Sequence, residues 1–193
     1  MLNIKFIGGK MLKEFTEAFV LVFAAEVGDK TQLMLMTLSA KYSIMQMLLG
    51  ILLGVVVNHG AAVFIGSFLS NAADDSMLQI FSGAMFIVFG IIIIVFDDEN
   101  ENKRDFKFGP VITTALTFFL GEMGDKTQLT AMTLAMEAKY PLIILSGSVA
   151  GMLSIGFVGI IIGTSLTKHI PSYIIKTISG LIFIIFGLMR LDG

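Results

Sequence analysis

The chain has 193 residues, of which 55% are hydrophobic and only 15% are charged, and its formal net charge is −2. Soluble domains typically carry about 25% charged residues, so this composition favours a membrane protein. The absence of Cys excludes disulfides, thiolate metal sites and Cys nucleophiles, and no basic patch indicates a nucleic-acid partner.

Apolar stretches of roughly 20 residues recur along the whole chain, as expected for transmembrane helices. The predicted spans are 12–40, 44–69, 77–96, 109–138, 142–166 and 173–189. The first apolar run could be a signal peptide, but an equivalent run recurs inside the chain, so we interpret it as a structural span. Because 12–40 is too long for a straight helix across a hydrocarbon core of roughly 30 Å, we expect a kink or break near Gly28.

The only long polar stretch, 97–108, is predicted to be a solvated loop between two halves, 1–96 and 109–193. Its bases Lys103, Arg104 and Lys107 favour a cytoplasmic loop with both termini on the other side of the membrane.

One heptapeptide occurs twice, as Glu26-Val27-Gly28-Asp29-Lys30-Thr31-Gln32 and as Glu122-Met123-Gly124-Asp125-Lys126-Thr127-Gln128. The duplication extends further, since Gly50 and Gly54 recur as Gly147 and Gly151; we expect these glycines to let helices approach closely. Three spans per unit force the second unit to enter the membrane from the opposite side. The predicted fold is an all-α integral membrane protein, with six transmembrane helices in two inverted three-helix repeats and a site at the repeat interface.

The charges of this motif lie in apolar surroundings. On a continuous helix Glu26, Asp29 and Lys30 would share one face. Each ionised group near the bilayer centre costs about 3 kcal/mol on insertion scales, so these groups must pair, bind an ion or line a wet cavity. The four carboxylates and two ammonium groups of the two copies sum to −2, which one divalent cation would neutralise.

Carboxylate, amide and hydroxyl oxygens form a hard ligand set that suits Ca²⁺, Mn²⁺ or Mg²⁺. The candidate metal ligands are Glu26, Asp29, Gln32, Glu122, Asp125 and Gln128, with Lys30, Thr31, Lys126 and Thr127 in supporting roles. A structural alternative is that each Glu–Lys pair at i,i+4 is only an internal ion pair, with the Asp capping a helix break.

The motif E-x-G-D-[KR]-[TS], present twice in a six-span chain of this length, resembles that of the Gdt-type family of divalent-cation antiporters. This family includes Golgi Ca²⁺/Mn²⁺ transporters and bacterial manganese exporters. The resemblance implies a secondary transporter that exports a divalent cation, Mn²⁺ before Ca²⁺, in exchange for protons or another cation. It also implies that Glu26, Asp29, Glu122 and Asp125 are the metal ligands. The compact size indicates a prokaryotic member in the plasma membrane, with no resident cofactor.

An intramembrane hydrolase that uses the paired carboxylates on a peptide or lipid phosphate is the alternative from another class. However, Glu26 and Glu122 stand where an aspartyl-protease G-x-G-D motif would have Gly. Asn58 and His59 are polar residues of the second span without polar counterparts in the repeat. For His59, a hydrogen-bonded core residue is the simpler interpretation, and a proton relay or an extra ligand stays open.

Overall fold

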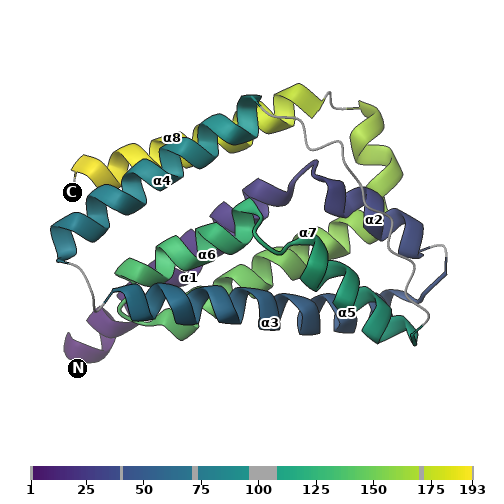
Figure 1. The fold of residues 1–193 in the computed structure, drawn as a ribbon, viewed down its shortest axis with the longest axis horizontal. Helices are drawn as coiled ribbons and strands as arrows, with labels where there is room; N and C mark the ends of the chain where they lie inside the picture. The colour runs from purple at the N-terminus through teal and green to yellow at the C-terminus, as the bar shows by residue number, and fades with distance from the viewer. Residues whose placement is uncertain (1, 40, 71–73, 96–107, 170–171, 193) are drawn as a thin grey trace.

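The structure, a computed structural model, describes residues 2–39, 41–70, 74–95, 108–169 and 172–192; within these ranges it describes all side chains except 2–7, 30, 32–33, 36–37, 75, 162–169 and 172. The predicted loop 97–108 therefore lies, apart from Phe108, outside the described residues. All regular structure in the described ranges is helical (Figure 1). The helices are α1 (Leu2–Glu26), α2 (Lys30–Ser39), α3 (Ile44–Leu69), α4 (Asp75–Val95), α5 (Pro110–Gly121), α6 (Lys126–Glu137), α7 (Pro141–His169) and α8 (Ser172–Asp192).

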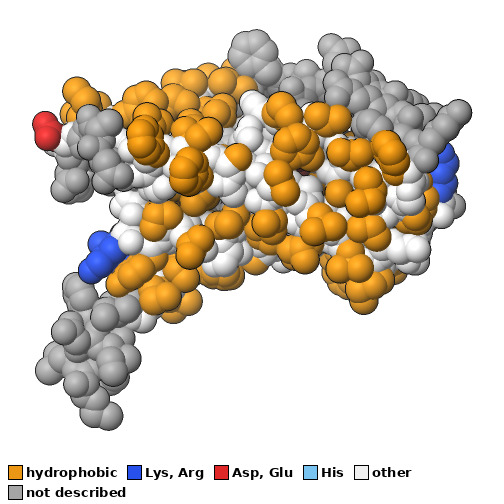
Figure 2. All heavy atoms as spheres, turned by 60° about the horizontal axis from the view of Figure 1, so that its bottom comes forward, with side chains coloured by type: hydrophobic (Ala, Val, Ile, Leu, Met, Phe, Trp, Pro, Cys, Tyr) orange, Lys and Arg blue, Asp and Glu red, His pale blue; other side chains and the backbone are white. Residues whose placement is uncertain are grey.

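Four helices among the described residues are long and apolar enough to cross a membrane: Ile44–Leu69, Ser76–Val95, Pro141–Ile161 and Tyr173–Asp192. The predicted span 44–69 coincides with α3. Figure 2 shows hydrophobic side chains along the length of one face, with coloured charges only near its two ends. The chain is therefore a helical membrane protein.

The predicted break near Gly28 is confirmed, and an equivalent break occurs in the second half. The chain leaves the helical path between α1 and α2 and again between α5 and α6. Gly28 and Gly124 have φ values of 80° and 78°. At each break, the Asp N–H donates a 3.2 Å hydrogen bond to the carbonyl oxygen of the motif Glu. A turn with this bond and a positive φ at its third residue is type II, which strongly favours Gly at that position.

The long second helix of each half packs against the broken helix of the other half. A Cβ built at Gly54 of α3 would lie 2.5 Å from the Ala115 carbonyl oxygen of α5, and one at Gly151 of α7 would lie 3.0 Å from the Phe19 carbonyl oxygen of α1. One turn earlier, a Cβ at Gly50 would contact the Val111 carbonyl oxygen, and one at Gly147 would contact the Phe15 carbonyl oxygen. The prediction of close approach at these glycines is confirmed, and the order of contacts shows that α3 runs parallel to α5 and α7 parallel to α1.

The last helices of the two halves, α4 and α8, lie side by side (Figure 1). A Cβ at Gly187 would lie 2.6 Å from the Gly83 carbonyl oxygen, and one at Gly180 would lie 2.5 Å from that of Gly90. Since the lower-numbered glycine of α4 faces the higher-numbered glycine of α8, these two helices run antiparallel.

Gly66→Ala is expected to lower the thermal stability of the detergent-solubilised protein. A Cβ at this position of α3 would clash with the Met132 carbonyl oxygen of α6. Because that atom is backbone and cannot rotate away, we expect a cost of about 1–3 kcal/mol. Gly60→Ala on the same helix is the matched control. Among the described residues, no neighbouring atom lies within 4 Å of a Cβ at Gly60, and Ala gains about 1 kcal/mol over Gly in a helix interior. Size-exclusion chromatography after heating measures both variants, and equal losses would contradict the packing argument.

Candidate ion-binding site

The two motif glutamates are buried at the ends of the first half-helices. Glu26 is 0% exposed and Glu122 is 1% exposed. The Thr31 hydroxyl donates a 2.6 Å hydrogen bond to Glu26 Oε2, and the Thr127 hydroxyl donates a 3.2 Å bond to Glu122 Oε2. Each Thr lies in the half-helix after the break, so this bond spans the turn and orients the carboxylate. Glu26 Oε1 accepts no hydrogen bond from the residues that the structure describes.

The two motifs meet through an ion pair between Asp29 and Lys126, which are 97 positions apart. The two side chains are only 6% and 12% exposed. The same ammonium group also interacts electrostatically with Glu26 and Asp125. The ammonium group of the second motif is therefore in contact with one carboxylate of the first motif and feels the charge of carboxylates from both motifs.

The expectation that Glu26, Asp29 and Lys30 share one helix face is wrong, because the chain turns between Glu26 and Lys30. Of the structural alternative, the Asp cap at a helix break is confirmed for the second motif, where Asp125 caps α6. Glu122 follows the end of α5, whereas Lys126 begins α6 and pairs with Asp29 of the first motif. The ion pair between Lys126 and Asp29 therefore joins the two halves of the chain.

The second break is held by its own polar side chains. Asp125 precedes α6, and its Oδ1 accepts a 2.6 Å hydrogen bond from the Lys126 N–H. The Gln128 amide oxygen accepts a 2.6 Å bond from the Gly124 N–H. In this conformation the oxygen of Gln128 stabilises the turn, and its second lone pair is the one that an ion could use.

Asn58 of α3 ties the two sides of the second break together. The side-chain amide of Asn58 donates a 3.3 Å hydrogen bond to the Phe119 carbonyl oxygen of α5. The backbone carbonyl oxygen of Asn58 accepts a 3.3 Å hydrogen bond from the side-chain amide of Gln128 in α6. The sequence indicates Asn58 because it is a polar residue of the second span without a polar counterpart in the repeat. His59 is 0% exposed, and neither ring nitrogen has a hydrogen-bond partner among the described residues. The interpretation as a hydrogen-bonded core histidine does not hold in this structure.

The side chains of Lys30 and Gln32 lie outside the described residues. Within the described part of the chain, no three His, Cys, Asp or Glu side chains are close enough together to hold a metal ion. The Lys126 ammonium contacts Asp29 and interacts electrostatically with other carboxylates of both motifs. A divalent cation that used these carboxylates would therefore take the place that the ammonium now holds.

Comparison with known proteins identifies the family. A family model described as the divalent cation/proton antiporter GDT1 matches residues 14–101 and 110–192. A "Putative manganese exporter" of Vibrio cholerae is 25% identical over 169 residues, which cover 86% of this chain and 84% of that protein. GDT1-like protein 5 of Arabidopsis thaliana is 24% identical over 222 residues, covering 95% of this chain and 97% of that protein. No solved structure matches the chain significantly.

The family match covers both halves of the chain, including both buried motifs. It confirms the resemblance that the repeated motif indicates, and it excludes the intramembrane hydrolase. The chain belongs to the GDT1 family of divalent cation/proton antiporters, and it is a transporter rather than an enzyme.

Proposed function

We propose that this protein exports Mn²⁺ across a prokaryotic plasma membrane in exchange for protons, through one site shared by its two motifs. The observation that carries the proposal is the buried ion pair between Asp29 and Lys126, which joins the two motifs at two matching helix breaks. The proposed ligands are Glu26, Asp29, Gln32, Glu122, Asp125 and Gln128.

Charge balance explains why a divalent cation and protons would exchange. The four motif carboxylates and the two motif ammonium groups sum to −2, so one divalent cation compensates them. Carboxylates must be deprotonated to bind a metal ion. Protons and the metal therefore compete for the same oxygens, which couples their movement in opposite directions.

Oxygen ligands support the choice of Mn²⁺. Neither motif contains His or Cys, the ligands that hold Zn²⁺ and Cu⁺ most strongly. Mg²⁺ sheds water reluctantly and demands a tight octahedron at about 2.1 Å. Among the remaining hard cations, Mn²⁺ is favoured over Ca²⁺ because the Vibrio cholerae relative is named a manganese exporter.

Reconstituted protein should accumulate radiolabelled Mn²⁺ inside liposomes that are acidic within, because outward proton flow drives metal inward. A protonophore should abolish this accumulation, and excess Ca²⁺ should compete better than excess Zn²⁺. Uptake that ignores the protonophore would contradict proton coupling. Stronger competition by Zn²⁺ than by Ca²⁺ would contradict the oxygen-ligand argument.

We propose that α1–α4 and α5–α8 are inverted repeats that cross the membrane six times, with the 97–108 loop in the cytoplasm. The antiparallel pairing of α4 with α8 and the parallel pairing of α3 with α5 support opposite orientations of the two halves. Alternating access would then exchange which side of the shared site is open.

Cysteine labelling tests this topology without background, because the chain has no Cys. Lys41 and Lys139 are exposed residues of equivalent Lys-Tyr turns. Lys41→Cys and Lys139→Cys should react with a membrane-impermeant maleimide from opposite sides of sealed vesicles. Reaction of both from the same side would contradict the inverted arrangement.

A further inference from the structure

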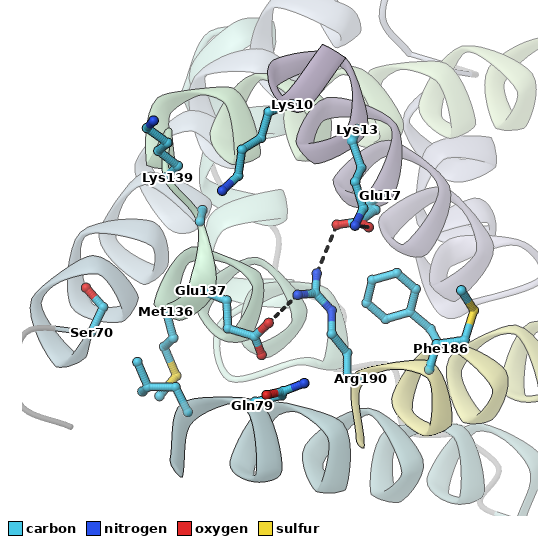
Figure 3. Close-up of a pocket in the computed structure, with 13 residues that line it drawn as sticks. Lys10, Lys13, Glu17, Ser70, Gln79, Met136, Glu137, Lys139, Phe186 and Arg190 are labelled. Atoms are coloured by element: carbon cyan, nitrogen blue, oxygen red, sulfur yellow. Dashed lines mark hydrogen bonds and ion pairs between the residues drawn. The ribbon is translucent and has the colours of Figure 1, made fainter. Parts of the chain in front are cut away.

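A cavity of about 640 Å³ lies between α1, α4, α6 and α8, away from the helix breaks (Figure 3). Charged side chains from three of these helices line it: Lys10, Lys13 and Glu17 from α1, Glu137 from α6 and Arg190 from α8. Helices α1 and α6 are the halves of the broken helices that end and begin at the two motifs. The cavity therefore lies at the far ends of the two helices that lead to the candidate ion site.

The lengths of these helices place the cavity relative to the motifs. At 1.5 Å per residue, α1 covers about 14 Å from Glu17 to Glu26, and α6 covers about 16 Å from Lys126 to Glu137. Both distances are near half of a hydrocarbon core of roughly 30 Å. With the motifs near the bilayer centre, the cavity lies at one membrane surface, where an ion would enter or leave.

Arg190 joins three helices across this cavity (Figure 3). Its guanidinium donates one hydrogen bond to Glu137 Oε2 and another, of 2.9 Å, to Glu17 Oε2. It also lies 5.0 Å from the centroid of the Phe186 ring. The Arg190, Glu17 and Glu137 side chains are 23%, 17% and 14% exposed. This half-buried bridge holds α8 against both motif-bearing helices.

The bridge belongs to one end of the molecule. The repeat positions that correspond to Glu17, Glu137 and Arg190 are Thr113, Ser39 and Ile93. An apolar residue stands in place of the guanidinium, and hydroxyl side chains stand in place of both carboxylates. The equivalent positions at the opposite end therefore cannot form the same bridge.

We infer that the Glu17–Arg190–Glu137 bridge is a gate that closes this cavity on one side of the membrane, an inference that rests on the proposed transport function. A divalent cation in the cavity competes with the guanidinium for both carboxylates. Its arrival therefore releases α8 from α1 and α6, which opens the way along these two helices. When the ion has left, the guanidinium returns, and its positive charge repels a second cation.

The gate can be tested by thiol labelling of the full chain in lipid nanodiscs, where both membrane faces are accessible. Met136 lines the cavity and is 7% exposed, so Met136→Cys reports on opening there. Met47 is 0% exposed and lies near the start of α3, whereas Ser70, just past the end of α3, lines the cavity. Met47→Cys therefore reports on general loosening far from the gate.

Arg190→Gln should increase the rate at which Met136→Cys reacts with a charged methanethiosulfonate about tenfold, since two half-buried ion pairs are lost. It should leave the rate at Met47→Cys unchanged. Lys139→Gln is the matched control, because it removes a positive charge from the same cavity wall while the Lys139 ammonium lies over the Tyr140 ring. This control should leave both rates unchanged.

An unchanged rate at Met136→Cys in the Arg190→Gln variant would overturn the gate. An equal rise with Lys139→Gln, or a parallel rise at Met47→Cys, would also overturn it by showing a general effect of charge or of stability. The labelling does not depend on transport. Faster labelling in a protein that moves no Mn²⁺ would therefore refute the proposed function and leave the closure intact, whereas normal Mn²⁺ transport with unchanged labelling would refute the gate alone.

Discussion

Glu26→Gln and Glu122→Gln are each expected to abolish metal exchange in proteoliposomes. Both side chains are buried, and each accepts a hydrogen bond from a Thr across its helix break. The amide keeps the size of the side chain and can still accept that bond, but it removes the charge that a cation needs. Mutation of the outer-shell partners of metal ligands typically lowers metal affinity or activity roughly 10–100-fold. Loss of the charge of a ligand itself should therefore reduce the transport rate at least about 100-fold.

If the two glutamates serve one site, the double variant should be no worse than either single variant. Asp74→Asn, at an exposed position before α4, should transport normally and controls for loss of an acid as such. Substantial transport by either glutamate variant would indicate two independent sites or a structural role.

Asp29→Asn is expected to stop transport and also to destabilise the protein, because it removes one side of a buried ion pair with Lys126. Breaking a buried pair costs about 3–5 kcal/mol, while removal of both charges is often close to neutral. Adding Lys126→Gln to Asp29→Asn should therefore restore most of the thermal stability. Transport should stay absent, because the carboxylate that would bind the ion is still missing.

The two measurements separate the structural role of the pair from its role in transport. Chromatography after heating follows stability, and Mn²⁺ uptake follows function. Recovery of both in the double variant would show that Asp29 only neutralises Lys126. Recovery of neither would show that the pair is not the main reason for the loss of stability.

The sequence predicts the features of the fold that depend on local chemistry. The 44–69 span appears as α3, and the break expected near Gly28 from the length of the first span is present. The matched glycines of the second helices lie where helices touch. Each of these predictions needs only apolar length, glycine conformation and the internal repeat.

The sequence could not predict which charges meet. Lys126 pairs with Asp29 across 97 positions, and Arg190 reaches Glu17 across 173 positions. Glu14 accepts 2.9 and 3.1 Å hydrogen bonds from the backbone N–H groups of Lys139 and Tyr140 just before α7. Such partners are set by helix packing between the halves, which a repeat in one sequence does not specify.

The glycine contacts between α4 and α8 have a consequence for how such a chain can arise. Gly83 faces Gly187, while Gly180, the repeat counterpart of Gly83, faces Gly90. This reciprocal pairing is the mark of an isologous two-fold interface, which normally forms between identical subunits. A half-length ancestor with one motif could have built the whole ion site as a homodimer, and the present chain corresponds to that dimer with its subunits fused. Two halves joined in one chain, unlike the identical subunits of a homodimer, can differ, and Glu17, Glu137 and Arg190 accordingly occupy one end alone.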